Sequence, residues 1–479
     1  MQSKKEVIVE LEIESIGFQG ISIARKEGLV YFVKGAVPGD IVNAKVRKKR
    51  KKYIETTIIE ILKPSEHRIP PKCNYFGVCG GCSWQHLSYD QQIIWKKQHI
   101  IDAFTRNVKV DVGYFEDTLA SPKVFNYRNK MEFSFGSSRW LTKEEIDSND
   151  NISQKEFALG LHVPGRYDKI IDIQHCHIQN EICNKVLKLI REKALELEVT
   201  AYNNHSHEGF LRNLILRTSV ENNELMIILV SNDIKSENEQ VFLNWFENDF
   251  LGLVPEAAVI AHAVNNTLSP VAFGDTRIIS GTGYITENIL GIDFQISPYS
   301  FFQTNSSQLN KFIEEIIKVG EMSNSDMVWD LYCGTGSITL PASKVCKEII
   351  GIELFEGSIK DARKNAELND ITNAEFICAD LHEKDISTLL DSLPNPDIIF
   401  IDPPRAGLHK NLLNNILKIN PEKLVYVSCN PSTQARDCEI LSEKYEVNSI
   451  KPVDMFPHTF HLESIALLKR KDKQKFSNS

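Results

Sequence analysis

The stretch "VWDLYCGTGSITL", residues 328–340, decides the fold of this chain. Its apolar start predicts a buried strand over 326–332, and the residues after the glycines predict a helix over 337–347. Gly334 and Gly336 form a tight turn between them, in which the backbone can approach a ligand closely. The unpaired N–H groups at the start of the helix favour a negatively charged or polar ligand. The stretch therefore predicts a ligand site at the end of a strand.

Two ligand classes compete for this turn. A dinucleotide-binding turn carries a third glycine, but Thr339 occupies that position here. Asp330, four residues before Gly334, is typical instead of the turn that cradles S-adenosylmethionine. Glu353 ends the next predicted strand, about twenty residues later, where a carboxylate can accept hydrogen bonds from both ribose hydroxyls. Asp380 closes "EFICAD" and is placed to reach the adenine, although an aspartate there also suits a helix cap.

Downstream of residue 300, strand-like and helix-like segments alternate regularly. Such alternation predicts a mainly parallel sheet covered on both faces, the Rossmann-like α/β class, over residues 291–470. Strands are predicted at 326–332, 348–353, 375–379, 397–402 and 424–428, and helices at 337–347, 356–369, 408–418 and 431–444. A polar tail, "KRKDKQKFSNS", ends the chain, and residues 471–479 are set apart as this tail.

Length and composition limit what the chain can be. With 479 residues, 42% hydrophobic and 25% charged, it predicts a globular protein of two to four domains. No apolar run is long enough to cross a bilayer, and the N-terminal "MQSKKEVIVELEIE" lacks a secretory signal. We therefore expect a cytoplasmic protein without a membrane partner.

The N-terminal residues 1–62 predict an all-β barrel of the oligonucleotide-binding type. Strand-like runs occur at 7–14, 21–25, 29–34, 41–47 and 53–62. Between the last two lies "RKKRKK", Arg47 to Lys52, which is either a solvated charge run or a phosphate-binding edge. Residues 1–62 carry 12 Lys and Arg against eight Asp and Glu, a net charge of +4. Because the whole chain has a net charge of −9, residues 63–479 carry −13. Contact with nucleic acid is thus expected to be local.

Residues 63–290 predict a central domain of mixed α+β character. Strands are expected at 127–136 and 211–219, and a helix at 91–107 is expected to pack on the catalytic domain. Cations on these strands are candidates to line an RNA path, namely Arg128, Lys130, Arg212 and Arg217. The function of this region cannot be read from its residues alone.

A cysteine follows a buried strand at the other end of the chain. In "LVYVSCNP" Cys429 lies between the strand and Pro431, which suits the first turn of a helix. A free cysteine is more often a buried small hydrophobe than a nucleophile. However, Asp402 ends a neighbouring strand in "DPPR", and Glu463 follows "HTFHL" before the last strand. This combination resembles pyrimidine C5 methylation, in which a thiolate adds to C6 and a base later removes the C5 proton.

In their order along the chain, "SPYSFFQTN", "DLYCGTG", "DPPR", "SCNP" and "HTFHLE" resemble the S-adenosylmethionine-dependent RNA 5-methyluridine methyltransferases. Members of this family act on 23S ribosomal RNA and on the tRNA T-loop. The resemblance implies Cys429 as nucleophile and Glu463 as base. It also implies a methyl-donor site at Gln303, Tyr332, Ser337, Glu353 and Asp402, and it makes residues 1–62 a TRAM domain. RNA cytosine-5 enzymes differ, because they carry a cysteine in the Asp-Pro loop where this chain has Pro404 and Arg405.

Three cysteines lie close together in "CNYFGVCGGC". Such spacing is compatible with zinc, but no fourth ligand lies nearby in the sequence. The family resemblance instead implies a [4Fe–4S] cluster bound by Cys73, Cys79, Cys82 and the distant Cys176. Cys183 is expected to be a spare thiol outside the cluster, and Cys333 and Cys438 are expected to be packing residues.

Taken together, these features predict a three-domain, monomeric enzyme that methylates uridine C5 in RNA, with 23S rRNA as the target and no role for DNA. The TRAM barrel and the cluster favour rRNA, because tRNA enzymes of the family typically lack both. The alternatives are the same chemistry on the tRNA T-loop, methylation of a nitrogen by the same fold, and a non-catalytic RNA-binding or assembly factor.

Overall fold

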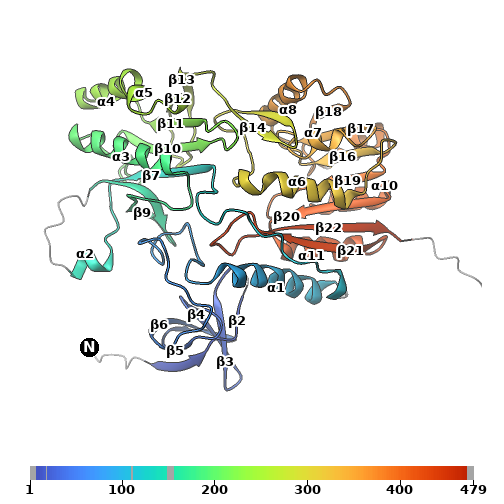
Figure 1. Cartoon of the computed structure of the whole chain (residues 1–479), viewed down its shortest axis with the longest axis horizontal. Helices are drawn as coiled ribbons and strands as arrows, with labels where there is room; N and C mark the ends of the chain where they lie inside the picture. The colour runs from blue at the N-terminus through green and yellow to red at the C-terminus, as the bar shows by residue number, and fades with distance from the viewer. Residues whose placement is uncertain (1–6, 18, 109–111, 148–155, 384, 472–479) are drawn as a thin grey trace, which may run out of the picture.

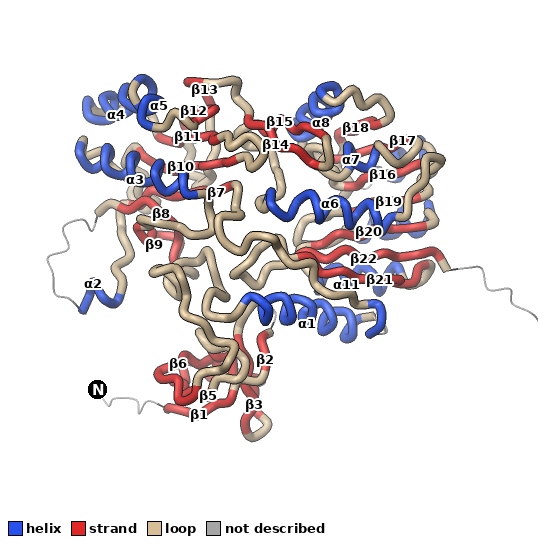
Figure 2. Tube along the Cα trace, viewed as in Figure 1, coloured by secondary structure: helices blue, strands red, loops and turns tan. Residues whose placement is uncertain are grey.

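A computed structural model describes residues 7–17, 19–108, 112–147, 156–383 and 385–471. Three large sheets follow one another along the chain: an N-terminal barrel, a central mixed sheet and a C-terminal sheet flanked by helices (Figure 1). The tube view shows the barrel set apart at one end, below the long helix α1 (Tyr89–Asn107) (Figure 2). Of the expected polar tail 471–479, residues 472–479 lie outside the described residues.

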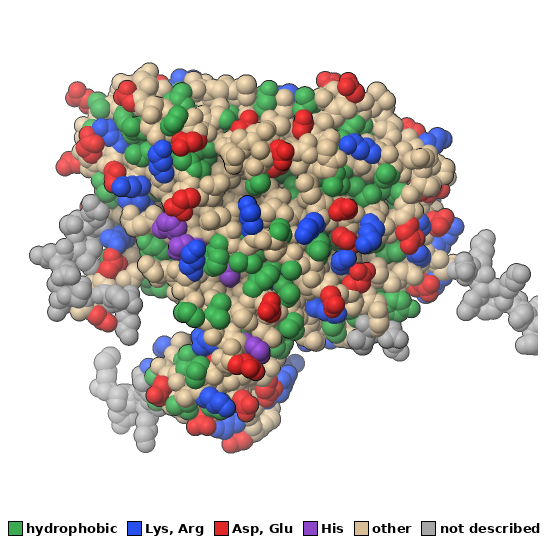
Figure 3. All heavy atoms as spheres, in the orientation of Figure 1, with side chains coloured by type: hydrophobic (Ala, Val, Ile, Leu, Met, Phe, Trp, Pro, Cys, Tyr) green, Lys and Arg blue, Asp and Glu red, His purple; other side chains and the backbone are tan. Residues whose placement is uncertain are grey.

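The barrel contains six strands in the order β1-β5-β6-β4-β3-β2. They are β1 (Ile8–Glu12), β2 (Ser15–Ile16), β3 (Ser22–Lys26), β4 (Leu29–Lys34), β5 (Ile41–Lys49) and β6 (Tyr53–Lys63). The expected strand 7–14 is thus interrupted before the short β2, and the Glu14 amide donates to Ile23, which joins the end of β1 to β3. The cationic run occupies the end of β5 and the turn into β6. In Figure 3, charged side chains of both signs are interspersed over the barrel and over the body of the molecule.

The central sheet is mixed, with the order β13-β12-β11-β10-β7-β8-β9. Its strands are β7 (Lys130–Gly136), β8 (Ala158–Val163), β9 (Arg166–Asp172), β10 (Leu211–Thr218), β11 (Leu225–Ser231), β12 (Ala257–Val264) and β13 (Asp275–Ser280). The helices α3 (Glu181–Glu196), α4 (Glu237–Asn248) and α5 (Phe250–Leu253) cover one face (Figure 1), where Val186, Phe242 and Phe250 pack against Phe133. The short α2 (Lys143–Asp147) lies in the connection between β7 and β8.

Two arginines of β10 are not on the surface, so the expectation that they line an RNA path is wrong. Arg212 is 4% exposed and donates to the carbonyls of Asn265, Thr267 and Ser269. Arg217 is 3% exposed and donates to the carbonyls of Ser297, Pro298 and Ser300. Burial lowers the pKa of Arg217 to about 10. Each guanidinium thus holds a loop in place, because a buried cation needs several acceptors.

The C-terminal sheet has the order β18-β17-β16-β19-β20-β22-β21. The strands β16 (Met327–Leu331), β17 (Glu348–Glu353), β18 (Ala374–Cys378), β19 (Ile398–Ile401) and β20 (Lys423–Ser428) are parallel, whereas β21 (Tyr445–Val453) and β22 (Glu463–Arg470) form an antiparallel edge. The helices are α6 (Ser306–Gly320), α7 (Thr339–Ser343), α8 (Glu356–Leu368), α9 (Ile386–Ser392), α10 (Lys410–Ile419) and α11 (Pro431–Leu441). This arrangement confirms the predicted Rossmann-like class with an added N-terminal barrel.

One predicted helix is much shorter than expected. The segment 337–347 contains only α7, five residues long, and Pro341 lies inside it. Because proline lacks an N–H and restricts the residue before it, it limits regular helix on its N-terminal side. Residues 338–343 are nevertheless buried, and Leu340 and Ala342 belong to the core.

The hydrophobic core is continuous between the central and the C-terminal sheets. The hairpin of β14 (Ile285–Ile289) and β15 (Ile292–Ile296) lies between them, and its Ile285 and Phe294 are buried. One cluster of buried side chains includes Val259 of the central sheet, Phe294 of the hairpin and Val328 of the C-terminal sheet. The two sheets are therefore packed as one body through the hairpin.

Helix α1 connects the barrel to the C-terminal sheet. Its Ile100 and Phe104 are fully buried together with Leu441 of α11 and Ile450 of β21, and the 3₁₀ turn η1 (Val112–Tyr114) follows it. On the barrel side, His99 forms a hydrogen bond of 3.1 Å to the Ile16 carbonyl. No helix in the described parts of the chain is long and apolar enough to cross a membrane.

Candidate active site and cysteine cluster

Cys429 follows β20 directly and lies half-buried at the start of α11. The next residue, Asn430, caps the helix, because its side-chain oxygen accepts a hydrogen bond from the Ser432 amide. The side-chain nitrogen of Asn430, Nδ2, also donates to the Arg405 carbonyl at 3.0 Å. The helix cap therefore fixes the loop "DPPRAG" beside the cysteine.

The strand register brings Glu463 close to Cys429. Ser428 of β20 pairs with Ser464 of β22, so Cys429 and Glu463 each adjoin this pair, and the charge of Glu463 acts on the thiol. Asp402 ends the neighbouring parallel strand β19. The structure thus brings together the three residues that the sequence placed 27 and 34 positions apart.

The electrostatics of this triad are unfavourable for negative charge. Burial, together with the charges of Glu463 and Asp402, raises the pKa of Cys429 to about 11, while the nearby Arg405 lowers it. Burial also raises the pKa of Asp402 to about 7. The pKa of Glu463 lies well above its usual value, because the side chain is buried and Asp402 is close by. Such shifted groups in one place are typical of acid–base chemistry.

Arg405 supplies the positive charge of this site. Its guanidinium lies 3.4 Å from Nδ1 of His461, and its charge lowers the pKa of both Cys429 and Glu463. Burial and the neighbouring cation lower the pKa of His461 to about 4, so the imidazole is neutral at neutral pH. A neutral histidine can accept a hydrogen bond from Arg405.

The loop that carries Arg405 is held from below by Asp437, which is fully buried. Its carboxylate accepts hydrogen bonds from the Tyr426 hydroxyl at 2.7 Å and from the Leu408 amide at 2.8 Å. Gly407 has a φ of 77°, and a Cβ atom there would come within 2.6 Å of the Asp437 carboxylate. Glycine is therefore required for this turn.

The segment 454–462, which leads to Glu463, is held by helix α1. Lys96 and Asp454 are both completely buried, and Nζ lies 2.5 Å from the carboxylate. The same ammonium donates to the Phe456 carbonyl at 3.0 Å. Gln92 accepts a hydrogen bond from the His458 amide at 2.8 Å. These contacts fix a segment whose His458 has a φ of 64°, a left-handed conformation that is uncommon for histidine.

The cysteine-rich segment contacts the same loop. The amides of Ser83 and Trp84 both donate to the His458 carbonyl at 2.9 Å, and the Phe460 amide donates to the Ser83 hydroxyl at 3.2 Å. Because Ser83 immediately follows Cys82, the cysteine cluster and the loop that ends at Glu463 are directly connected.

On the methyl-donor side, the glycine turn lies against Glu353. The carboxylate accepts hydrogen bonds from the amides of Gly334 at 3.2 Å and Phe355 at 3.0 Å. Asp330 is fully buried below the turn, where it accepts a hydrogen bond from the Thr339 hydroxyl at 2.5 Å and leaves Oδ1 without a partner. Burial raises the pKa of Asp330 to about 7. This carboxylate supports the turn from inside the protein.

The other predicted donor-site residues surround this turn. Tyr332 has a φ of 65° and its hydroxyl lies 3.2 Å from Nε2 of His382, whose amide donates to Asp380 at 2.8 Å. Gln303 is 9% exposed, and the loop that carries it reaches the turn, since the Thr335 hydroxyl is 3.5 Å from the Phe301 carbonyl. Ser337 is half-buried next to Gly336. Their individual roles stay predictions.

All four predicted cluster cysteines line one small cavity, together with Leu161, Ile173 and Ile178. Burial raises the pKa of Cys79 to about 11 and that of Cys82 to about 12, and neighbouring thiols add to both shifts. Cys183, Cys333 and Cys438 are buried. Among the described residues, no group of three or more Cys, His, Asp or Glu side chains is arranged to hold a single metal ion.

A cavity of about 590 Å³ opens beside the triad. Arg405, His461 and Phe456 of the C-terminal domain line it, and Arg128 and Lys130 of the central domain face them. Phe301 and Phe302 complete the aromatic part of the lining. A cavity with cations and aromatic rings suits a nucleotide, which offers phosphates and bases.

Sequence reasoning missed the buried polar residues that support the site. Gln92, Lys96 and His99 are buried on one face of α1, at helical spacing that includes Ile100 and Ala103. Polar residues within such an apolar stripe indicate buried partners, and this signal was available in the sequence. Asp454, the partner of Lys96, gave no signal, because the two residues are 358 positions apart in the chain.

Comparisons with known proteins agree with this geometry. Residues 274–471 match the tRNA (uracil-5-)-methyltransferase family, and residues 3–59 match the TRAM domain. An uncharacterized RNA methyltransferase of Chlorobaculum tepidum is 41% identical over 93% of this chain and 92% of its own length. One from Bacteroides thetaiotaomicron is 37% identical over 94% and 99%.

A solved structure is similar over almost the whole chain. The tRNA (uracil-54, C5)-methyltransferase of Pyrococcus abyssi, in complex with S-adenosyl-L-homocysteine, has a TM-score of 0.73 and 27% sequence identity. The match covers 96% of this chain and 100% of that one. The chain therefore belongs to the RNA (uracil-5-)-methyltransferase family with a TRAM domain and is an S-adenosylmethionine-dependent RNA methyltransferase.

Proposed function

We propose that this enzyme methylates C5 of a uridine in 23S rRNA, with Cys429 as nucleophile and Glu463 as base. The observation that carries the proposal is the placement of Cys429, Asp402 and Glu463 at adjacent strand ends, beside a cavity with cationic and aromatic lining. An enzyme that methylates a nitrogen has no chemical need for the thiol. A binding factor needs neither the thiol nor the carboxylates.

In this proposal Cys429 first gives its proton to solvent water, a step that Arg405 favours because its charge lowers the pKa of the thiol. The thiolate bonds to C6 of the uracil, and the C5–C6 π electrons form an enolate. C5 then takes the methyl group, and its bond to the donor sulfur breaks. Glu463 removes the C5 proton, the C5–C6 double bond reforms, and the C6–sulfur bond breaks to return the thiolate.

The bound donor supplies an electrophilic methyl group on a sulfonium sulfur. Glu353 is placed to accept hydrogen bonds from the ribose hydroxyls, because its carboxylate already lies at the glycine turn. Gly336, with a φ of 84°, keeps the backbone of that turn close to the ligand. Gln303, Tyr332, Ser337, Asp380 and Asp402 are proposed as the remaining donor-site residues.

We propose that the four cysteines bind a [4Fe–4S] cluster. In such a cluster each thiolate binds a different iron, so the four sulfurs surround a body wider than one ion. The cavity that Cys73, Cys79, Cys82 and Cys176 line supports this assignment. Because the thiols have raised pKa values, binding iron also displaces their protons. The cluster would fix the position of Ser83 and Trp84, whose amides donate to the His458 carbonyl.

The tRNA T-loop is the second candidate target. The Pyrococcus abyssi tRNA enzyme matches this chain along its full length, so the N-terminal region alone does not separate the two substrates. In either RNA the uridine must leave its stack before C6 can be attacked, which costs roughly a few kcal/mol. The TRAM barrel and the central domain are proposed to bind the opened loop and offset this cost.

We expect methyl label to enter 5-methyluridine of unmodified 23S rRNA. The test uses unmodified 23S rRNA and unmodified tRNA in separate reactions with methyl-labelled S-adenosylmethionine, followed by nucleoside analysis. Label in 5-methyluridine from tRNA alone would show that tRNA, and not 23S rRNA, is the substrate, while the proposed methylation of uridine C5 would stand. Label in another nucleoside would contradict the assignment of the acceptor site.

Replacement of the two reacting side chains should have different effects. Cys429→Ala should abolish methyl transfer, because no adduct forms at C6. Glu463→Gln should still form the adduct but fail to remove the C5 proton, so a protein–RNA complex that survives denaturing electrophoresis should accumulate. Cys438→Ala, which changes a buried cysteine on the next helix, is the control and should retain activity. Full activity of Cys429→Ala would exclude it as nucleophile.

The positive charge of Arg405 should set the pH dependence. In Arg405→Gln the pKa of Cys429, about 11 with the arginine present, should rise further, because the stabilising cation is lost. The rising part of the plot of kcat/KM against pH should therefore move to higher pH. At pH values below the pKa of Cys429, kcat/KM should fall about tenfold for each unit by which that pKa rises. Arg405→Lys keeps the charge and should move this rising part less. Alkylation rates of Cys429 without RNA provide a second measurement, and an unchanged profile in Arg405→Gln would refute this role.

Iron and acid-labile sulfide should be present in protein purified without oxygen, in about four equivalents each. Cys82→Ala and Cys176→Ala should each lower both contents and the visible absorbance of the cluster. Cys183→Ala is the matched control, since this cysteine is buried close to Cys176 but outside the proposed set. Equal iron contents in Cys82→Ala and Cys183→Ala would exclude the assignment.

A further inference from the structure

A small apolar cluster lies where the barrel meets the segment 454–462, which leads to Glu463. Its members come from the barrel, from the segment after the cysteines, from α1 and from the segment 454–462, and they are Ile16, Val37, Trp84, Leu87, Trp95 and Phe460. The barrel has a separate core of its own. The barrel is therefore packed against the segment that carries Phe460 as well as within itself.

The barrel reaches Phe460 through the turn between β2 and β3. Gly20 in this turn has a φ of 78°, and its carbonyl accepts a hydrogen bond of 3.5 Å from Nε1 of Trp84. A Cβ atom at Gly20 would lie 3.1 Å from the Cβ atom of Phe460 and 2.9 Å from Nε1 of Trp84. A methyl group at this position therefore has to displace one of the two side chains.

Of these two side chains, Trp84 is held more firmly. It is 1% exposed, and its amide donates to the His458 carbonyl at 2.9 Å while its indole binds the barrel. Phe460 is half-buried, and its amide donates to the Ser83 hydroxyl at 3.2 Å. Because the Phe460 ring has an open side and Trp84 has none, pressure from the barrel turn displaces the Phe460 ring.

The Phe460 ring in turn packs against the imidazole that faces Arg405. The ring centroids of Phe460 and His461 are 4.1 Å apart, and the His461 ring also meets Phe456 edge to face at 6.1 Å. Nδ1 of His461 lies 3.4 Å from the Arg405 guanidinium. Because a neutral imidazole nitrogen accepts a hydrogen bond there, the place of the Phe460 ring determines where Arg405 finds its acceptor.

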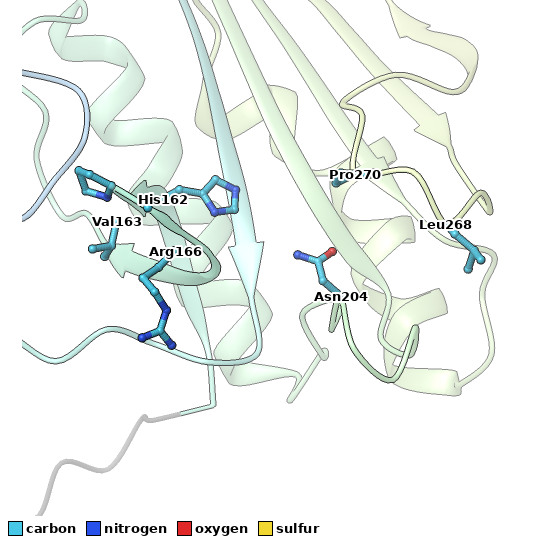
Figure 4. A pocket seen from close by; sticks show the side chains of 8 residues that line it. His162, Val163, Arg166, Asn204, Leu268 and Pro270 are labelled. Atoms are coloured by element: carbon cyan, nitrogen blue, oxygen red, sulfur yellow. The ribbon is translucent and has the colours of Figure 1, made fainter. Parts of the chain in front are cut away.

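The packing on the side of the central sheet is more open. A hollow of about 670 Å³ separates the β8–β9 hairpin, which carries His162 and Arg166, from the loops that carry Asn204 and Leu268 (Figure 4). None of the described residues that line this hollow belongs to the barrel or to the segment 454–462. Empty space absorbs small displacements, whereas close-packed side chains transmit them. A displacement of Arg405 through packing is therefore expected from the barrel side.

We propose that Phe460 is a positioning residue that makes the placement of Arg405 depend on the barrel. The barrel turn at Gly20 fixes the Phe460 ring, the ring fixes the His461 imidazole, and the imidazole orients the guanidinium beside Cys429. This inference rests on the proposed function, in which the charge of Arg405 favours the thiolate of Cys429. The barrel then has a role in the reactivity of the thiol that does not depend on bound RNA.

The test compares Gly20→Ala with Gly28→Ala in the full-length protein. Gly28 lies in the next turn of the barrel, between β3 and β4, and has a φ of 76°, but a Cβ atom there would meet nothing within 4 Å. Both variants place alanine at a positive φ and strain the barrel backbone in the same way. Only Gly20→Ala pushes on Phe460, so the pair separates the two effects.

The measurement is the rate at which iodoacetamide alkylates Cys429, as a function of pH, without RNA or methyl donor. In Gly20→Ala the rate at neutral pH should fall about threefold, because the thiolate loses part of the charge of Arg405. Glu463 and Asp402 also act on the thiol and are the same in every variant. Gly28→Ala should react at the wild-type rate. Cys378, exposed at the end of β18, is the internal reference in peptide mass spectrometry.

Two further variants test the route from the barrel to the thiol. Phe460→Ala should lower the Cys429 rate about as much as Gly20→Ala, and it keeps the test decisive if Gly20→Ala does not fold. In an Arg405→Gln background, Gly20→Ala and Phe460→Ala should have no further effect, because both act through Arg405. Unfolding would expose Cys429 and raise its rate, so a fall in rate does not come from misfolding.

Equal Cys429 rates in Gly20→Ala and Gly28→Ala, or an unchanged or higher rate in Phe460→Ala, would overturn the positioning role. A further loss of rate in the Arg405→Gln background would overturn the route through Arg405. If the wild type transfers no methyl group to any RNA but Gly20→Ala and Phe460→Ala still slow the alkylation of Cys429, the positioning role stands and the proposed function fails.

Discussion

The ion pair between Lys96 and Asp454 is the constraint on which the catalytic loop depends. Both side chains are completely buried, so burial lowers the pKa of Lys96 and the pair persists only with close geometry and further acceptors. The Phe456 carbonyl is such an acceptor. Losing one partner of a pair like this leaves a buried charge, which typically costs about 3–5 kcal/mol. The pair joins residues 358 positions apart and lies nine residues before Glu463, the first residue of β22.

Two kinds of electrostatic organisation meet in this enzyme. At the structural pair, opposite charges compensate each other within the protein. At the candidate active site, a thiol and two carboxyl groups lie close to the guanidinium of Arg405. Burial and the neighbouring carboxylates raise the pKa values of Cys429 and Glu463, and burial raises that of Asp402. Under the proposed mechanism, the sulfonium of the methyl donor would add a positive charge to this site and the enolate a negative one.

Local sequence patterns predicted much of this fold. The alternation that predicted the strand 348–353 matches β17, and the predicted 356–369 differs from α8 by one residue. The helix predicted at 337–347 is much shorter, because α7 spans only Thr339–Ser343 and Pro341 limits regular helix before it. Arg212 and Arg217 were misplaced on the surface, since a strand pattern does not show which cations meet buried carbonyls. The contacts of Gln92 and Lys96 with a loop more than 350 residues away likewise have no local signature.

The shared core of the central and C-terminal sheets has a consequence for substrate choice. Because Val259, Phe294 and Val328 belong to one buried cluster, a change in the angle between the two sheets would break buried contacts. Under the proposed function the uridine must leave its stack, so the RNA would carry much of the change in shape. The cost of opening a given loop would then enter the choice of substrate, and bases that never touch the protein would contribute through their stacking.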